Sequence, residues 1–395
     1  MRTDLGWTLD PDWIFLNHGS YGACPEPVLA AQREWRDRLE RQPVRFMDDV
    51  LPAALDSARE RVAAFIGADP AGLAFVPNAT TGVNAVLRSL RFAPGDELLT
   101  DDHEYNATIN ALRAVADRDA ATVVMARLPF PPRGEDEIVE ALLDRVTPRT
   151  RLLMVSHVTS PTALVLPIDR LVRAFEARGI DTLVDGAHAP GMLPLDVDAI
   201  GAAYYTGNGH KWLCGAKGSA FLWVRADRRG AIHPPVTSHG ANDPRTDRSR
   251  FRLEFDWMGT ADPTAALALP AAIDVVAGLD PGGWPAVMAA NQTLALDAGR
   301  RLSAALGGAA STPPSMVASM TSVVVPGLAS DADGLALKRH LEADRIEVPV
   351  VPWPVRAGRT DPGGAPDAVL LRVSAQRYNE PSDIDALVAS FARWP

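Results

Sequence analysis

Cysteine is scarce in this sequence, which has only Cys24 and Cys214 among its 395 residues. Two cysteines cannot form the disulfide framework that is typical of small secreted domains. Residues 1–7 also lack the continuous apolar core of a signal peptide. We therefore expect a protein of a reducing compartment, most simply the cytoplasm.

Long apolar runs and an excess of positive charge are absent as well. The most apolar stretch, 265–279, is interrupted by Pro270 and Asp274, so it does not reach the length of about 18 residues that a transmembrane helix needs. The net charge of −10 argues against a nucleic-acid surface, which requires a basic patch. We expect neither membrane nor nucleic acid as a partner.

An alternation of strand and helix patterns is present instead. Short apolar runs alternate with helical patterns between residues 73 and 224, which predicts an α/β fold with a mostly parallel sheet covered by helices on both faces. The expected strands are 73–76, 97–100, 122–128, 151–157, 181–184, 202–205 and 219–224, and the expected helices are 27–39, 55–66, 80–90, 107 onward, 135–146 and 168–178.

The last third of the chain has a different pattern, with helices over 265–278, 292–306, 334–344 and 383–393 and short strands at 322–325 and 369–374. We expect Ser382 to cap the last helix. A chain of this length exceeds one core. We predict a large domain, 18–265, and a smaller α+β domain made of 1–17 and 266–395.

Polar residues follow the expected strands at one edge of the sheet. Thr80, Tyr105, His157, Asp185 and His210 each lie at or just after the end of an apolar run. Ligands of such folds bind beyond the carboxyl ends of the strands. We therefore expect these side chains to surround a ligand.

An acid and a lysine within this set indicate a pyridoxal phosphate site. Asp185 ends an apolar strand, His188 follows three residues later, and Lys211 lies in a turn of small residues. The cofactor needs a lysine amine for covalent attachment and a carboxylate that keeps its ring nitrogen protonated. Taken singly, each residue has a simpler interpretation as a surface lysine, a turn cap or a core histidine.

The helix that begins near Thr80 offers a second feature of such a site. Free N–H groups at a helix start hold phosphate, and the hydroxyls of Thr80 and Thr81 would add to them. The alternative is that a threonine only caps the helix.

Four strings carry a family resemblance: Asn17-His-Gly-Ser-Tyr-Gly22, Ser156-His-Val-Thr-Ser160, Val184-Asp-Gly-Ala-His-Ala-Pro-Gly191 and Gly207-Asn-Gly-His-Lys-Trp-Leu213. Their order resembles the class V aminotransferase family of fold-type I pyridoxal phosphate enzymes, in its isopenicillin N epimerase-like and C–S lyase-like branch. The resemblance implies pyridoxal 5'-phosphate as the cofactor, no metal, an amino-acid substrate and a homodimer with shared active sites.

The resemblance also assigns roles at the cofactor. Lys211 would carry the cofactor, Asp185 would pair with its ring nitrogen, and His188 would lie near its phenolic oxygen. Tyr105 would stack on the ring, whereas His103, two positions earlier, is interpreted as a loop residue. Further residues would hold the phosphate: Thr80, Asn208 and His210, with Thr260 from the neighbouring subunit.

At the substrate, the resemblance assigns Arg372 to the α-carboxylate, which a planar guanidinium can bind through two hydrogen bonds. The alternative for Arg372 is a salt bridge. The other residues that would border the substrate are Asn17, His18, Gly19 and Ser160. Arg356 and Arg359, in a segment rich in proline and glycine, are candidates for reading a second carboxylate.

One difference from the desulfurases of the family argues against desulfuration through a protein persulfide. Those enzymes carry sulfur on a loop cysteine shortly before the arginine, but residues 348–372 contain no cysteine, and Ser160 stands where they have Asn. After Cα deprotonation, reprotonation on the other face gives an epimer, loss of a β-thiolate gives a C–S lyase, and reprotonation on the cofactor gives an aminotransferase. We expect an epimerase first, a lyase second and an aminotransferase third; a non-catalytic binding protein would not need Lys211.

Overall fold

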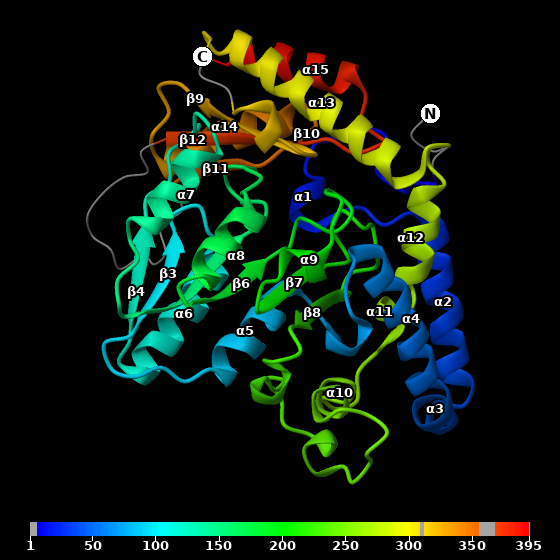
Figure 1. Cartoon of the computed structure of the whole chain (residues 1–395). Helices are drawn as coiled ribbons and strands as arrows, with labels where there is room; N and C mark the ends of the chain where they lie inside the picture. Colours follow the sequence, from blue (N-terminus) through cyan, green and yellow to red (C-terminus); the bar gives the residue numbers. More distant parts are fainter. Residues whose placement is uncertain (1–5, 309–311, 355–367, 395) are drawn as a thin grey trace.

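A seven-stranded sheet forms the centre of the computed structural model, which describes residues 6–308, 312–354 and 368–394 (Figure 1). Its strand order is β2-β8-β7-β6-β5-β3-β4. The five strands from β7 to β4 are parallel, whereas β8 pairs antiparallel with both β7 and β2. The strands are β2 (Leu73–Val76), β3 (Glu97–Asp101), β4 (Thr122–Ala126), β5 (Thr150–Ser156), β6 (Asp181–Asp185), β7 (Tyr204–Asn208) and β8 (Ala220–Val224). The mostly parallel sheet predicted from the sequence is confirmed.

Successive residues of the central strands pack against opposite faces of this sheet. Leu98 and Leu183 belong to a buried cluster with α5 (Ala79–Ser89) and α6 (Asn106–Asp119). Leu99 and Val184 belong to a second buried cluster with α7 (Glu135–Leu143) and α8 (Ile168–Glu176). Because side chains alternate along a strand, a strand buried on both faces has to be continuously apolar, as these runs are.

The remaining helices of the first 305 residues flank the sheet or lead away from it. They are α1 (His18–Tyr21), α2 (Glu26–Arg41), α3 (Pro43–Arg45), α4 (Leu51–Ile66), α9 (Val197–Ile200), α10 (Arg250–Phe255), α11 (Thr264–Leu267), α12 (Leu269–Ala277) and α13 (Gly283–Ala305). The single helix expected over 265–278 is therefore two helices, with Leu269 and Ile273 of α12 packed into the core of the large sheet.

A smaller sheet lies beside the large one, under α13 and α15 at the top of Figure 1. It has the antiparallel order β11-β12-β9, made of β9 (Met320–Val325), β11 (Val350–Trp353) and β12 (Ala368–Ser374), with α14 (Asp331–Ala343) and α15 (Pro381–Phe391). The N-terminal strand β1 (Ile14–Phe15) pairs in parallel with β10 (Ile346–Glu347), so the start of the chain lies against its last third. The domain limits at 17 and 265 remain a prediction.

The expected cap of α15 is wrong. Glu380, not Ser382, is the N-cap, since its side chain accepts the N–H of Asp383 while the Asp383 side chain accepts the N–H of Glu380. This reciprocal pair satisfies two free donors at the helix start. Among the described residues no helix is long and apolar enough to cross a membrane.

Candidate active site

Asp185 is placed at the carboxyl end of β6 and is buried. Its Oδ1 accepts the N–H of Ala187 at 2.9 Å and its Oδ2 accepts the hydroxyl of Thr108 at 3.3 Å. No lysine or arginine of the described residues lies within 4 Å of the carboxylate, and burial raises its pKa. A buried carboxylate with two partners and no cation is suited to pair with a protonated ring nitrogen.

Lys211 lies in the turn after β7, where its amine meets His188. The Nζ to Nε2 distance is 3.2 Å, and the indole Nε1 of Trp212 donates to His188 Nδ1 at 3.3 Å. A neutral His188 that accepts at Nδ1 carries its hydrogen on Nε2, and it can donate this hydrogen only to a neutral amine. Burial, and then the charge of Arg372, lower the pKa of Lys211 to about 8, which favours that neutral amine.

The backbone of Lys211 rests on helix α1. His18 is buried, and its Nε2 lies 3.1 Å from the Lys211 carbonyl oxygen while its Nδ1 lies 2.8 Å from the Tyr378 hydroxyl. At Gly22, which has a φ of +57°, an added Cβ would lie 2.5 Å from the His210 carbonyl oxygen. His18 and Gly22 therefore both pack against the backbone of the turn that carries Lys211.

The start of α5 meets the end of β7, where a phosphate was expected. The Asn208 side chain accepts the N–H of Ala79 at 2.8 Å, and the helix cap is Asn78, which accepts both the N–H and the hydroxyl of Thr81. The threonine-cap alternative is therefore wrong. Thr80, whose hydroxyl makes none of these bonds, lies in the first turn beside the cap.

His210 follows the end of β7 by two residues and is neutral there. Burial, and then Lys211, lower its pKa to about 4, and its Nδ1 lies 3.0 Å from the Ser219 carbonyl oxygen. An anion bound beside His210 would favour the charged imidazole, which has a second donor at Nε2.

Arg372 is a buried guanidinium on β12 that contacts only neutral groups. It donates to the Ser160 carbonyl oxygen at 2.6 Å and to the Ser20 hydroxyl at 3.0 Å, and its Nε has no partner. Among the described residues no carboxylate lies within 4 Å of it, so the salt-bridge alternative is wrong there. Burial lowers its pKa to about 10. A buried cation without an anion is suited to bind an anionic ligand.

Three other residues predicted at the substrate, Ser160, Gly19 and Asn17, make the following contacts. Ser160 accepts from Arg372 with both its carbonyl oxygen and its hydroxyl, and Gly19 donates its N–H to Ser374 Oγ at 3.0 Å. Asn17 Oδ1 accepts the Ser20 hydroxyl at 2.5 Å, which links Asn17 to Arg372 through Ser20.

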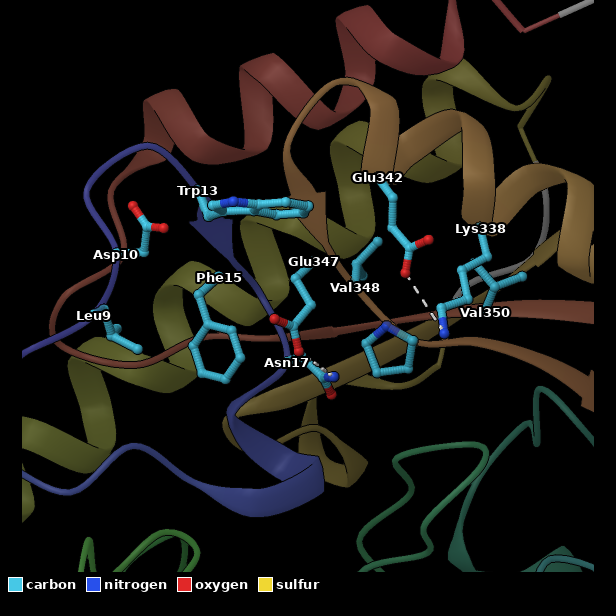
Figure 2. Close-up of a pocket in the computed structure, with 11 residues that line it drawn as sticks. Leu9, Asp10, Trp13, Phe15, Asn17, Lys338, Glu342, Glu347, Val348 and Val350 are labelled. Atoms are coloured by element: carbon cyan, nitrogen blue, oxygen red, sulfur yellow. Dashed lines mark hydrogen bonds and ion pairs between the residues drawn. The ribbon is translucent and has the colours of Figure 1, made fainter.

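Figure 2 shows a pocket of about 610 Å³ on the side of Asn17 where its amide donates to Glu347. Aromatic and charged residues from the N-terminal segment and α14 line this pocket, including Trp13, Lys338 and Glu342. Lys338 is ion-paired with Glu342 at 3.6 Å, and neither Lys211 nor Asp185 lines the pocket. The pocket therefore lacks the groups that could deprotonate Cα.

Tyr105 lies between β3 and α6 with its side chain about half exposed. The preceding residue, Glu104, is buried and accepts the Ser156 hydroxyl at 2.8 Å. Burial, and then the charge of Asp185, raise the pKa of Glu104 well above its usual value.

The remaining residues for which the sequence made a prediction are His103, His157, Thr260, Arg356 and Arg359. His103 lies in the turn after β3, as predicted, and it is buried there with Nδ1 2.8 Å from the Thr162 hydroxyl. His157 is buried, with Nδ1 2.8 Å from the Tyr205 hydroxyl. Thr260 is exposed between α10 and α11, so its predicted role needs a second copy of the chain. Arg356 and Arg359 lie outside the described residues.

Three contributors were not anticipated from the sequence. Ser20 contacts Arg372, Thr108 contacts Asp185, and Trp212 fixes His188. Ser20 and Trp212 lie within the family strings 17–22 and 207–213, so their sequence position could have predicted a role. Thr108 lies in the first turn of α6, and no pattern distinguished it.

The residues present fit pyridoxal phosphate. A partly buried amine with a lowered pKa at Lys211, a buried carboxylate without an ion pair at Asp185 and a helix start beside Asn208 match the aldehyde, the ring nitrogen and the phosphate of the cofactor. When bound, the cofactor accepts the electron pair that Cα deprotonation leaves behind.

The rate of cofactor attachment to the cofactor-free protein is expected to level off near pH 8. Only a neutral amine attacks an aldehyde, and the pKa of Lys211 is lowered from 10.5 to about 8, so the neutral fraction rises with pH only up to that value. Stopped-flow absorbance after mixing with pyridoxal phosphate measures this rate. A rate that keeps rising tenfold per pH unit to about pH 10 would show an ordinary solvated lysine instead.

Comparisons with known proteins identify the family of this chain. The aminotransferase class-V family model matches residues 22–387. Isopenicillin N epimerase of Amycolatopsis lactamdurans is 39% identical over 96% of this chain and 94% of its own length. A probable chloroplastic L-cysteine desulfhydrase of Arabidopsis thaliana is 33% identical over 96% of this chain and 82% of its own length.

Solved structures share the fold. C-DES, with glycine covalently linked to its pyridoxal phosphate cofactor, superposes with a TM-score of 0.82 at 22% identity and covers 98% of this chain and 97% of its own. The cysteine desulfurase CsdA of Escherichia coli gives 0.79 at 23% identity, covering 100% and 98%. Together with the family match, these findings show that the chain belongs to the class V aminotransferase family and is a fold-type I, pyridoxal phosphate-dependent enzyme.

Proposed function

We propose that the protein is an amino-acid epimerase of the isopenicillin N epimerase type. The observation that carries the proposal is Arg372, a buried cation without an anion whose charge reaches Lys211. An α-carboxylate bound by Arg372 would bring Cα close to the Lys211 amine, which can take its proton.

In this proposal each residue acts on a defined atom. Arg372 orients the carboxylate of the substrate, and Ser160, which is bound to Arg372, borders the substrate. The Lys211 amine removes the Cα proton. Asp185 keeps the ring nitrogen protonated, His188 donates to the phenolic oxygen, and Tyr105 stacks on the ring. The phosphate is held by Thr80, Thr81, Asn208 and His210.

We further propose a cytoplasmic homodimer in which Thr260 of each subunit reaches the phosphate of the other. The exposed position of Thr260 supports a contact made across an interface. Two domains, 18–265 and 1–17 with 266–395, complete the proposal.

A C–S β-lyase is the second candidate, because the L-cysteine desulfhydrase relative spans nearly the whole chain. Chiral chromatography separates the two candidates. Incubated with isopenicillin N, the epimerase returns a mixture of the two Cα epimers; incubated with L-cysteine, the lyase releases sulfide and pyruvate. Sulfide release without any epimer formation would overturn the epimerase proposal.

A further inference from the structure

Inversion at Cα by two bases needs a second acid–base group in addition to Lys211. A proton taken from one face of Cα has to be replaced on the other face, so a two-base epimerase needs a second acid–base group opposite the lysine. Lys211 and His188 cannot supply both faces, because their side chains are hydrogen-bonded to each other on one side of the site.

The titratable side chains that the sheet order places on the other side include His157 after β5 and Glu104 and Tyr105 after β3, and of these three only Tyr105 is exposed. β6, which ends in Asp185, has β7 and the Lys211 turn on one flank and β5 followed by β3 on the other. Tyr105 follows β3. A ring whose nitrogen is held by Asp185 therefore has Lys211 towards one flank of the sheet and Tyr105 towards the other.

Arg372, which is expected to bind the substrate carboxylate, interacts electrostatically with groups on both flanks of the sheet. Its charge lowers the pKa of Lys211 and of His188, and the Tyr105 phenol in turn raises the pKa of Arg372 against the effect of burial. The charge of Arg372 therefore interacts with groups from both flanks of the sheet. Because Cα is bonded directly to the carboxylate that Arg372 would hold, Tyr105 lies within the neighbourhood of Cα.

Tyr105 also has the properties that a proton donor needs. Its side chain is 49% exposed, so water can return a proton to it after each turnover. Its hydroxyl makes no hydrogen bond within the part of the chain that the structure describes. His188, by contrast, has both ring nitrogens engaged, one with Trp212 and one with Lys211.

We propose that the Tyr105 phenol is the second acid–base group, acting on the face of Cα opposite Lys211. From one epimer, the Lys211 amine takes the Cα proton and becomes an ammonium, and the Tyr105 hydroxyl then gives its proton to the other face and becomes a phenolate. The other epimer reacts with the form that holds a Lys211 ammonium and a Tyr105 phenolate: the phenolate removes the Cα proton, the ammonium donates one to the opposite face, and proton exchange with water interconverts the two forms. This inference rests on the proposed epimerase function and adds to the stacking role of Tyr105.

Tyr105→Phe separates proton transfer from stacking, since phenylalanine keeps the flat ring. The holoenzyme is incubated in D₂O with isopenicillin N or with its Cα epimer, and NMR follows deuterium at Cα. We expect the variant to exchange one epimer, the one deprotonated by Lys211, at close to the wild-type rate. Exchange of the other epimer and interconversion should fall about 100-fold or more. Cofactor content and the visible circular dichroism band should be unchanged.

Two further variants complete the test. Tyr105→His keeps a titratable ring and should restore part of the interconversion. Tyr21→Phe removes the hydroxyl of a tyrosine that is 75% exposed and should leave both exchange rates unchanged.

If Tyr105→Phe lowers the Cα exchange rates of the two epimers equally, with or without weaker cofactor binding, Tyr105 only stacks on the ring. That result would overturn the inference. If the wild-type enzyme itself fails to interconvert the epimers, the proposed function is overturned, whatever the variants do.

Discussion

Asp185→Asn is expected to lower kcat about 10²- to 10³-fold, the usual cost of removing one buried electrostatic stabiliser of a transition state. Asparagine has nearly the same size and can still accept the Ala187 N–H that Asp185 accepts at 2.9 Å. It has no charge to keep the cofactor's ring nitrogen protonated, so the electron pair left by Cα deprotonation is taken up less well.

Steady-state kinetics and the visible spectrum of the bound cofactor measure this effect together. The fold should be retained, because the carboxylate is buried without a cation and its neutral replacement removes a desolvation cost. Thr108→Val, which removes only the hydroxyl that donates to Asp185, is the matched control and should cost much less. A kcat of Asp185→Asn equal to that of the wild type would show that Asp185 does not contact the ring.

Arg372→Leu is expected to lower kcat/KM about 30- to 5,000-fold, which corresponds to the loss of about 2–5 kcal/mol when one partner of a desolvated charge pair is truncated. Most of the change should appear in KM, because the guanidinium binds the carboxylate in the ground state as well as in the transition state. The loss should be smaller for Arg372→Lys, which keeps the charge but not the paired donors.

Thermal unfolding of the cofactor-free protein distinguishes a binding role from a structural one. The wild-type guanidinium is buried without an anion among the described residues, which costs the folded state free energy. The Leu variant should therefore unfold at a temperature no lower than the wild type. A marked drop in Tm, with kcat/KM lost in proportion, would mean that Arg372 stabilises the fold and does not anchor substrate.

Much of this site could be predicted because it depends on two sequence-local rules. Continuous apolar runs identify strands buried on both faces, as at β6, and the residue that follows such a strand lies at the ligand edge of the sheet. Asp185, Lys211 and Arg372 were found in this way and by resemblance, and the structure brings the environments of Lys211, Asp185 and Arg372 within electrostatic reach of one another.

What could not be predicted depends on packing between distant segments. The contact of His18 with the Lys211 carbonyl joins residues 193 positions apart, and that of Arg372 with Ser20 joins residues 352 apart. No periodicity encodes such pairs. The burial of His103 had the same origin, since its ring packs beside Trp353 from the small sheet.

The attachment site of the cofactor tests the account most directly. The chain has three lysines, Lys211, Lys217 and Lys338, so borohydride reduction of the holoenzyme followed by peptide mass mapping gives an unambiguous answer. Lys217 donates to the Gly22 carbonyl oxygen and Lys338 is paired with Glu342, whereas Lys211 has a lowered pKa and its amine contacts the neutral His188. We predict that the reduced cofactor is found on Lys211 alone. Its presence on Lys217 or Lys338, or the absence of any modified lysine, would contradict the account.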